Sequence, residues 1–118
     1  MSAETGIWTP REIASMIGGL GLPSAYHHFQ TGPSAPDPPF LVFWYPSRDD
    51  FRADDRIWQQ IRLLRIELYT DQKDFDLEER VGAALDAAGL PYDTDEAWIE
   101  SERMYMVTYE TEVLMTDA

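Results

Sequence analysis

Residues 57–115 constrain the fold most strongly, because they read in succession as a strand, a helix and a β-hairpin. The helix has signals at both ends: Asp71 or Asp74 can cap its start, and Gly89 with Pro91 ends it. Half of the chain is therefore a folding scaffold that carries no recognisable catalytic motif. Function must come from the surfaces of the molecule or be indicated by kinship with a known family. The buried stripe of the helix is predicted to be Leu77, Val81, Leu85 and Ala88.

The strand predicted over residues 56–69 changes the phase of its apolar pattern. Ile61 and Leu63 are apolar at odd positions, whereas the apolar residues Leu64, Ile66 and Leu68 occupy even positions. Successive side chains of a strand point to opposite faces, so a regular strand with one buried face keeps a single phase. The pattern predicts either a β-bulge near Leu63–Leu64 or a strand that is covered on both faces.

The N-terminal half predicts one helix and two further strands. Thr9, Pro10 and Glu12 form a capping-box start for a helix over about residues 10–19, which a run of glycines ends. Strands are expected at 25–30 and at 40–45. The segment between these strands is an exposed connector because its four prolines lack backbone donors, and residues 47–55 are the polar tip of a long hairpin.

The C-terminal segment predicts the last hairpin. Residues 93–96 are expected to be a turn, residues 98–100 to begin the hairpin, and residues 105–113 to alternate between two faces. The order α-β-β-β-α-β-β indicates one α+β domain over residues 1–118. Its sheet is expected to be mostly antiparallel, with about four to five strands and two helices on one face.

Composition excludes several classes of protein. The 118 residues include no cysteine, which rules out disulfides and thiolate metal sites and fits a reducing cytoplasm. The start MSAETG has neither the basic nor the apolar region of a signal peptide, so we do not expect secretion by that route, and no apolar run is long enough to predict a membrane span. A net charge of −13 argues against direct capture of nucleic acid.

The charges are unevenly distributed. Five of the nine basic residues lie between positions 48 and 65, whereas residues 66–118 hold fifteen acids and three bases. One interpretation is solubility from an acidic surface. The other is that two surfaces of opposite charge meet between copies of the chain.

Polar clusters in the sequence do not assemble a reactive site. His27 and His28 are adjacent, so in a strand they would point to opposite faces and could not share a metal ion. The aspartates of 49–55 lack the spacing of a calcium loop, and Glu100 with Glu102 lack a partner acid. We predict no enzyme, no catalytic residue, no metal site and no cofactor.

Two tryptophans are candidates for an interface. Trp8 precedes the first helix and Trp58 follows the charged hairpin tip, and exposed aromatic residues near such segments commonly anchor interfaces. The alternative for Trp8 is a hydrophobic staple that packs on its own helix.

Four strings of the sequence together resemble a family of prophage and siphophage tail-completion proteins. They are GLPSAYHHF (21–29), FLVFWYP (40–46), ADDRIWQQIRLLRIELYTDQKDFDLEERV (53–81) and YDTDEAWIESERMYMVTYETEV (92–113). The resemblance covers nearly the whole chain and is strongest at IELYTDQKDFDLEE and IESERMY. These strings identify a family without carrying a catalytic motif.

The resemblance implies a small α/β ring protein, a tail terminator or head–tail joining protein at the head-proximal end of the tail tube. It implies a virion (tail or neck) location after assembly in the host cytoplasm and a homo-oligomeric ring, a hexamer in this family. The implied partners are the tail-tube protein and the head connector or adaptor proteins, with DNA passing through the lumen unbound and no membrane. The alternative function is an acidic inhibitor or DNA mimic of a nucleic-acid-binding protein. The interface residues expected for the ring are Trp8, Arg48, Arg52, Arg56, Trp58, Asp76, Glu79, Glu110 and Glu112.

Overall fold

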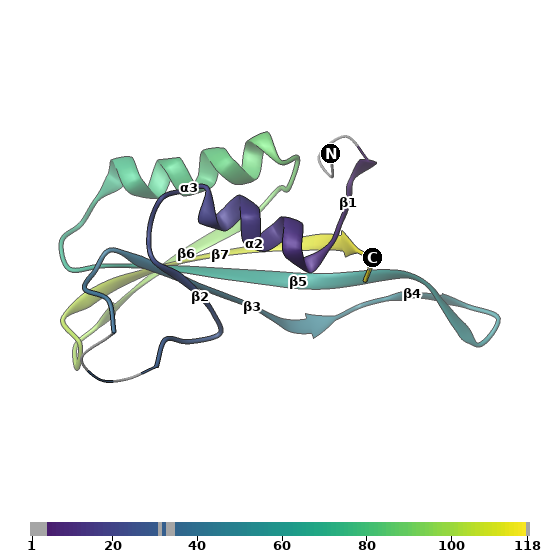
Figure 1. The fold of residues 1–118 in the computed structure, drawn as a ribbon, viewed down its shortest axis with the longest axis horizontal. Helices are drawn as coiled ribbons and strands as arrows, with labels where there is room; N and C mark the ends of the chain where they lie inside the picture. The colour runs from purple at the N-terminus through teal and green to yellow at the C-terminus, as the bar shows by residue number, and fades with distance from the viewer. Residues whose placement is uncertain (1–4, 31, 33–34, 118) are drawn as a thin grey trace.

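The computed structural model describes residues 5–30, 32 and 35–117, and it has two helices on one face of a seven-stranded sheet (Figure 1). The α+β class predicted from the sequence is confirmed. The elements in chain order are β1 (Ile7–Trp8), α2 (Pro10–Gly18), β2 (Ser24–Tyr26), β3 (Phe40–Arg48), β4 (Phe51–Ala53), β5 (Arg56–Thr70), α3 (Phe75–Ala87), β6 (Asp93–Ile99) and β7 (Met104–Met115).

The sheet is mixed, so the expectation of a mostly antiparallel sheet of four to five strands is wrong. Its order is β1-β7-β5-β3-β2, with β6 also pairing along β7 and β4 along β5. The long strands β3, β5 and β7 are antiparallel, whereas the edge strands β1 and β2 run parallel to β7 and β3. The predicted order omitted β1 and β4, because strands of two or three residues are too short to show a period.

Two local predictions also need correction. The strand expected at 25–30 is only Ser24–Tyr26, because the backbone of His27 turns into the left-handed region with φ of 69°. Residues 93–96 belong to β6 instead of a turn, and they pair in register with residues 107–110 of β7. The turn lies earlier, at Gly89, which adopts a positive φ of 73°.

The predicted irregularity is present, but it lies on the neighbouring strand. β5 pairs with β7 without interruption from Gln60 to Thr70. β3 instead shifts register between Trp44 and Ser47, so two of its residues oppose Leu64. One of the two is Pro46, which has no N–H to give to the ladder and is tolerated where pairing is interrupted.

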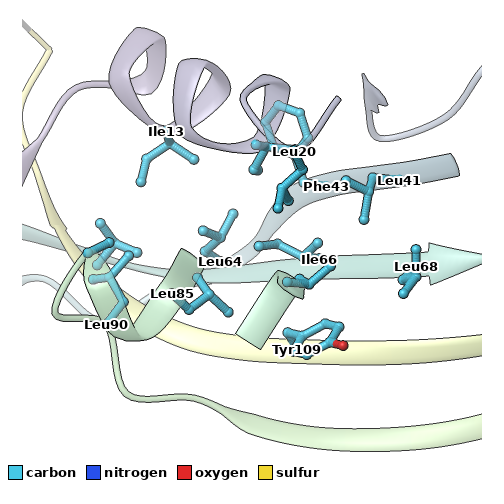
Figure 2. Packing of buried hydrophobic residues seen from close by; sticks show 14 of the residues in the cluster. Ile13, Leu20, Leu41, Phe43, Leu64, Ile66, Leu68, Leu85, Leu90 and Tyr109 are labelled. Carbon is cyan, nitrogen blue, oxygen red and sulfur yellow. The ribbon is translucent and has the colours of Figure 1, made fainter. Parts of the chain in front are cut away.

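The core lies between the helices and the sheet. α2 begins with the predicted capping box, since the Thr9 hydroxyl accepts from the Glu12 backbone and the Glu12 carboxylate accepts from the Thr9 backbone. Asp74, one of the two predicted caps, starts α3. From Leu64 to Thr70 the even-numbered residues of β5 are buried, and Leu64, Ile66 and Leu68 belong to the core cluster, while Arg65, Glu67 and Tyr69 alternate with them on the other face. Figure 2 shows the packed side chains Ile13 and Leu20 beside α2, Leu41 and Phe43 on β3, Leu64, Ile66 and Leu68 on β5, and Leu85, Leu90 and Tyr109.

Polar contacts fix the helices to the rest of the fold. The Tyr109 hydroxyl donates to the Glu78 carbonyl at 2.7 Å, which ties α3 to β7. The Arg80 guanidinium donates to the Leu20 carbonyl at 2.7 Å, which ties α3 to the end of α2. All four residues predicted for the buried stripe of α3 are in the core.

Candidate interaction surfaces

Residues 48–58 form a projecting hairpin, which we call the arm. It extends β3 and β5 beyond the end of β7 and makes one end of a molecule that measures 49 by 27 by 23 Å (Figure 1). The arm is held by pairing of β4 with β5, and it turns through Asp54 and Asp55, both in the left-handed region. The segment expected to be a polar loop tip is therefore a short paired hairpin.

The arm exposes large apolar side chains. Phe51 is 59% exposed, Ile57 50% and Trp58 52%, and Ile7 with Leu114 are exposed near its base. A groove of about 440 Å³ lies at that base and is lined by residues of the arm, β1 and β7. Apolar area of this kind, projected into solvent on a narrow element, is typical of a surface that a partner covers.

The tip of the arm is internally organised. The Trp58 indole N–H donates to the Ala53 carbonyl at 2.8 Å, and the Arg56 guanidinium lies 4.3 Å from the Trp58 ring centroid. Trp58 is thus exposed, as expected from the sequence, and also fixed in orientation. A side chain fixed before binding loses less conformational entropy when a partner covers it.

The charges of the arm are mixed. Arg48 forms an ion pair with Asp50 at 2.8 Å, and the same carboxylate accepts from the Ile61 backbone N–H at 3.0 Å. The hydrogen bond from Arg48 is the main cause that holds the pKa of Asp50 below its usual value, with the Ile61 contact adding to it. Three arginines face four aspartates in residues 48–58, so the arm is not net basic. Within the described residues Arg52 makes no hydrogen bond or ion pair.

The face of the sheet opposite the helices, which we call the open face, carries an ion network. Arg65 contacts Glu67 through Nε and Glu110 through Nη1, both at 3.1 Å, and its guanidinium lies 5.6 Å from the Trp44 ring centroid. The Tyr69 hydroxyl donates to Glu67 at 2.7 Å. Glu67 is only 6% exposed although neither helix covers this face.

A pocket of about 280 Å³ lies over Glu67 and is lined in part by described residues from the region between β2 and β3. Three aromatic rings line it: Phe29 meets Phe40 edge-on with centroids 5.4 Å apart, and Phe40 stacks on Tyr69 at 5.1 Å. Glu102 also lines the pocket. The remaining lining residues are His27, His28, Ala35, Pro36, Val42 and Met104. The pocket was missed from the sequence because its walls come from four separated segments.

The histidine pair is placed differently from the expectation. His27 and His28 do not point to opposite faces of a strand, because the backbone leaves the strand at His27. Their Nδ1 atoms are 3.0 Å apart and share one hydrogen bond. Among the described residues, His, Asp and Glu do not gather in any group of three that could hold a metal ion, and no described helix is long and apolar enough to cross a membrane.

The predicted interface residues are distributed over several surfaces. Trp8 is 6% exposed and belongs to the core cluster that contains Ile13, so the expectation that it is exposed is wrong and the alternative, a staple on its own helix, fits its burial. Asp76 and Glu79 are exposed on α3. Glu110 is paired with Arg65 on the open face, and Glu112 is exposed on the same strand.

Comparisons with known proteins identify the fold. No family model and no curated protein matches the sequence. The structure is similar to a chain in "Virion of native gene transfer agent (GTA) particle", with a TM-score of 0.57 and 16% identity over 95% of this chain and 91% of that chain. The chain thus shares its fold with a component of a gene transfer agent virion.

Proposed function

We propose that this protein is a structural component of a phage-like virion that forms a ring at the head-proximal end of the tail tube. The ring ends the tail and joins it to the head connector. The structural likeness to a virion component covers nearly all of both chains. The resemblance of the sequence to tail-completion proteins supports the same kind of role. A hexamer is the ring size expected from that resemblance.

The arm is the observation that carries the proposal. It projects exposed aromatic residues from one end of an elongated molecule, away from the packed core. A patch at one end that binds a different patch on the next copy gives head-to-tail association, which produces a ring when the rotation closes. Closure leaves no free arm, so growth stops at a fixed number of copies.

The two sides of the contact are unequal in character. The arm supplies Trp58, Arg52 and Arg56 from one copy. Two of the acids predicted to receive it, Asp76 and Glu79, are exposed on α3, and Glu112 is exposed on the open face. The fourth, Glu110, is already occupied by Arg65 within its own chain.

Electron microscopy of particles from a strain that lacks this gene tests the function. We expect filled heads without attached tails and tails of uncontrolled length, and both defects should be repaired by the wild-type gene supplied in trans. Tails of normal length attached to filled heads would contradict the proposal. A pull-down that recovers nucleases or polymerases in place of tail-tube or connector proteins would support the acidic DNA mimic.

A further inference from the structure

We propose that the pocket over Glu67 binds the guanidinium group of Arg52 from the arm of a neighbouring copy. This inference rests on the ring proposed above and names the surface that receives the arm. The pocket differs from the acids on α3, because it combines a buried carboxylate with aromatic walls.

The floor of the pocket carries negative charge that is not saturated. Glu67 uses one oxygen for Tyr69 and the other for Arg65. A carboxylate offers about four lone-pair sites, so Glu67 retains acceptor capacity toward the pocket. Glu102 adds a second carboxylate at the exposed rim. Arg65 is also shared with Glu110, so one cation faces two anions on this part of the sheet.

The walls suit a planar cation. Phe29, Phe40 and Tyr69 pack against one another and line the pocket together with the carboxylate. Aromatic faces attract cations, and a guanidinium stacks on them while its fork of N–H groups bonds a carboxylate. A volume of about 280 Å³ is enough for a guanidinium and its aliphatic stem.

Arg52 is the basic residue of the arm that is free to enter such a pocket. Arg48 is paired with Asp50, and Arg56 lies against Trp58. Arg52 is exposed beside the tip and makes no hydrogen bond or ion pair in the part of its own chain that the structure describes, and its charge acts on Asp50 only through space.

The two surfaces lie at opposite ends of the molecule. The arm forms one end, and the turn between β6 and β7, whose Glu102 lines the pocket, lies toward the other (Figure 1). An arm therefore meets this pocket on a second copy instead of its own. Contacts between unlike ends are heterologous, as a ring requires.

The chemistry of the pocket is tested first, without assembly. Arg52→Gln protein, which keeps the pocket intact, is titrated by NMR with N-acetyl-arginine amide and with N-acetyl-citrulline amide, its neutral analogue. We expect saturable shifts around Phe40 and Tyr69 with the arginine ligand alone. In the Arg52→Gln protein, a second substitution, Glu67→Gln, should weaken binding of the arginine ligand about tenfold or more, because a charged hydrogen bond is lost. Adding Asp86→Asn, on the exposed side of α3, should change nothing.

A second variant tests the pocket in case Glu67→Gln fails to fold. Phe29→Ala removes an aromatic wall and leaves the contacts of Glu67 with Arg65 and Tyr69 untouched, so it should also weaken the arginine ligand. Equal binding of citrulline and arginine ligands would overturn the proposal. So would arginine binding that survives both Glu67→Gln and Phe29→Ala.

The pairing of the two ends is tested by mixing. Arg52→Gln has an intact pocket and Glu67→Gln an intact arm, so each alone should assemble more slowly and more weakly than wild type, while a mixture forms more dimer than either variant alone through one intact junction. Arg11→Gln, on exposed α2, should assemble as wild type. If wild type assembles and the mixture stays monomeric, the pairing is wrong and the ring stands. If the wild-type protein is absent from virions, the proposed ring function is wrong, and the NMR titration still tests arginine binding by the pocket independently.

Discussion

Single residues on both faces of the sheet carry polar groups that burial makes hard to ionise. Burial, with a smaller contribution from Tyr26, raises the pKa of Tyr45 to about 12. Burial also raises the pKa of Tyr109, and it raises that of Tyr69, where the bond to Glu67 adds to the effect. In each case the neutral phenol is the form that the fold accommodates.

These three phenols predict a loss of stability at alkaline pH. A raised folded-state pKa means that the stabilisation is complete below the unfolded pKa of about 10 and is lost as pH rises toward the folded value. We expect the free energy of unfolding, measured by urea at each pH, to fall above about pH 10. Tyrosinate absorbance of the folded protein should show a late-titrating component from Tyr45, Tyr69 and Tyr109.

Tyr109→Phe separates one phenol from the others. It removes the hydrogen bond to the Glu78 carbonyl and should cost about 1 kcal/mol near neutral pH. It should also make the alkaline decline shallower. If all six tyrosines titrate together near their usual pKa, the burial argument is wrong.

At the scale of elements, the sequence predicts what has a period or a cap and misses what depends on distant pairing. The capping box of α2, the Asp74 cap of α3 and the long strands are confirmed, because each is encoded by neighbouring residues. β1 exists only because the end of β7 offers an edge, and its pairing buries Trp8. A two-residue strand has no local signal, whereas the burial of Trp8 agrees with the alternative drawn from the sequence, a hydrophobic staple on its own helix.

The candidate sites also divide into those encoded by neighbouring residues and those that depend on distant residues. Exposure of Trp58 and the arginine spacing in the arm were visible in one stretch of sequence. The pocket over Glu67 was not, because Glu67 reads as one acid in an alternating strand. Its burial depends on residues far away in the sequence, such as Phe29 and Pro36, which line the same pocket.

The arm should be separable from the fold. None of its residues belongs to the core cluster, so replacing residues 50–60 with Asn-Gly, a two-residue hairpin turn, should leave a folded monomer. Loss of the Asp50 and Gln59 bonds should cost about 1–2 kcal/mol. Circular dichroism and thermal melting should show native content, and light scattering no assembly. If the shortened chain still forms rings, the arm does not form the contact between copies.

At the scale of the whole molecule, two electrostatic effects oppose each other. Every copy carries a net charge of −13, so copies repel at long range. Contacts of the arm are local and partly covered, where salt screens less. Rim charge pairs are each worth roughly 0.2–1 kcal/mol, so they set orientation and rate while buried aromatic residues set affinity.

Reversing the charges of the arm should separate the long-range repulsion between copies from the local contacts of the arm. Wild-type assembly, followed by light scattering, should quicken as salt rises to about 0.1 M, where the screening length falls to about 10 Å. Arg52→Glu with Arg56→Glu should slow assembly at every salt concentration and most at low salt, while circular dichroism shows an unchanged monomer.

Two single variants, Arg52→Glu and Arg11→Glu, form a matched pair because they change the net charge equally. Added salt should restore Arg11→Glu, whose only defect is repulsion, and should not restore Arg52→Glu, which has lost a contact. Identical rates for these two variants across the salt series would mean that the charges of the arm serve only solubility.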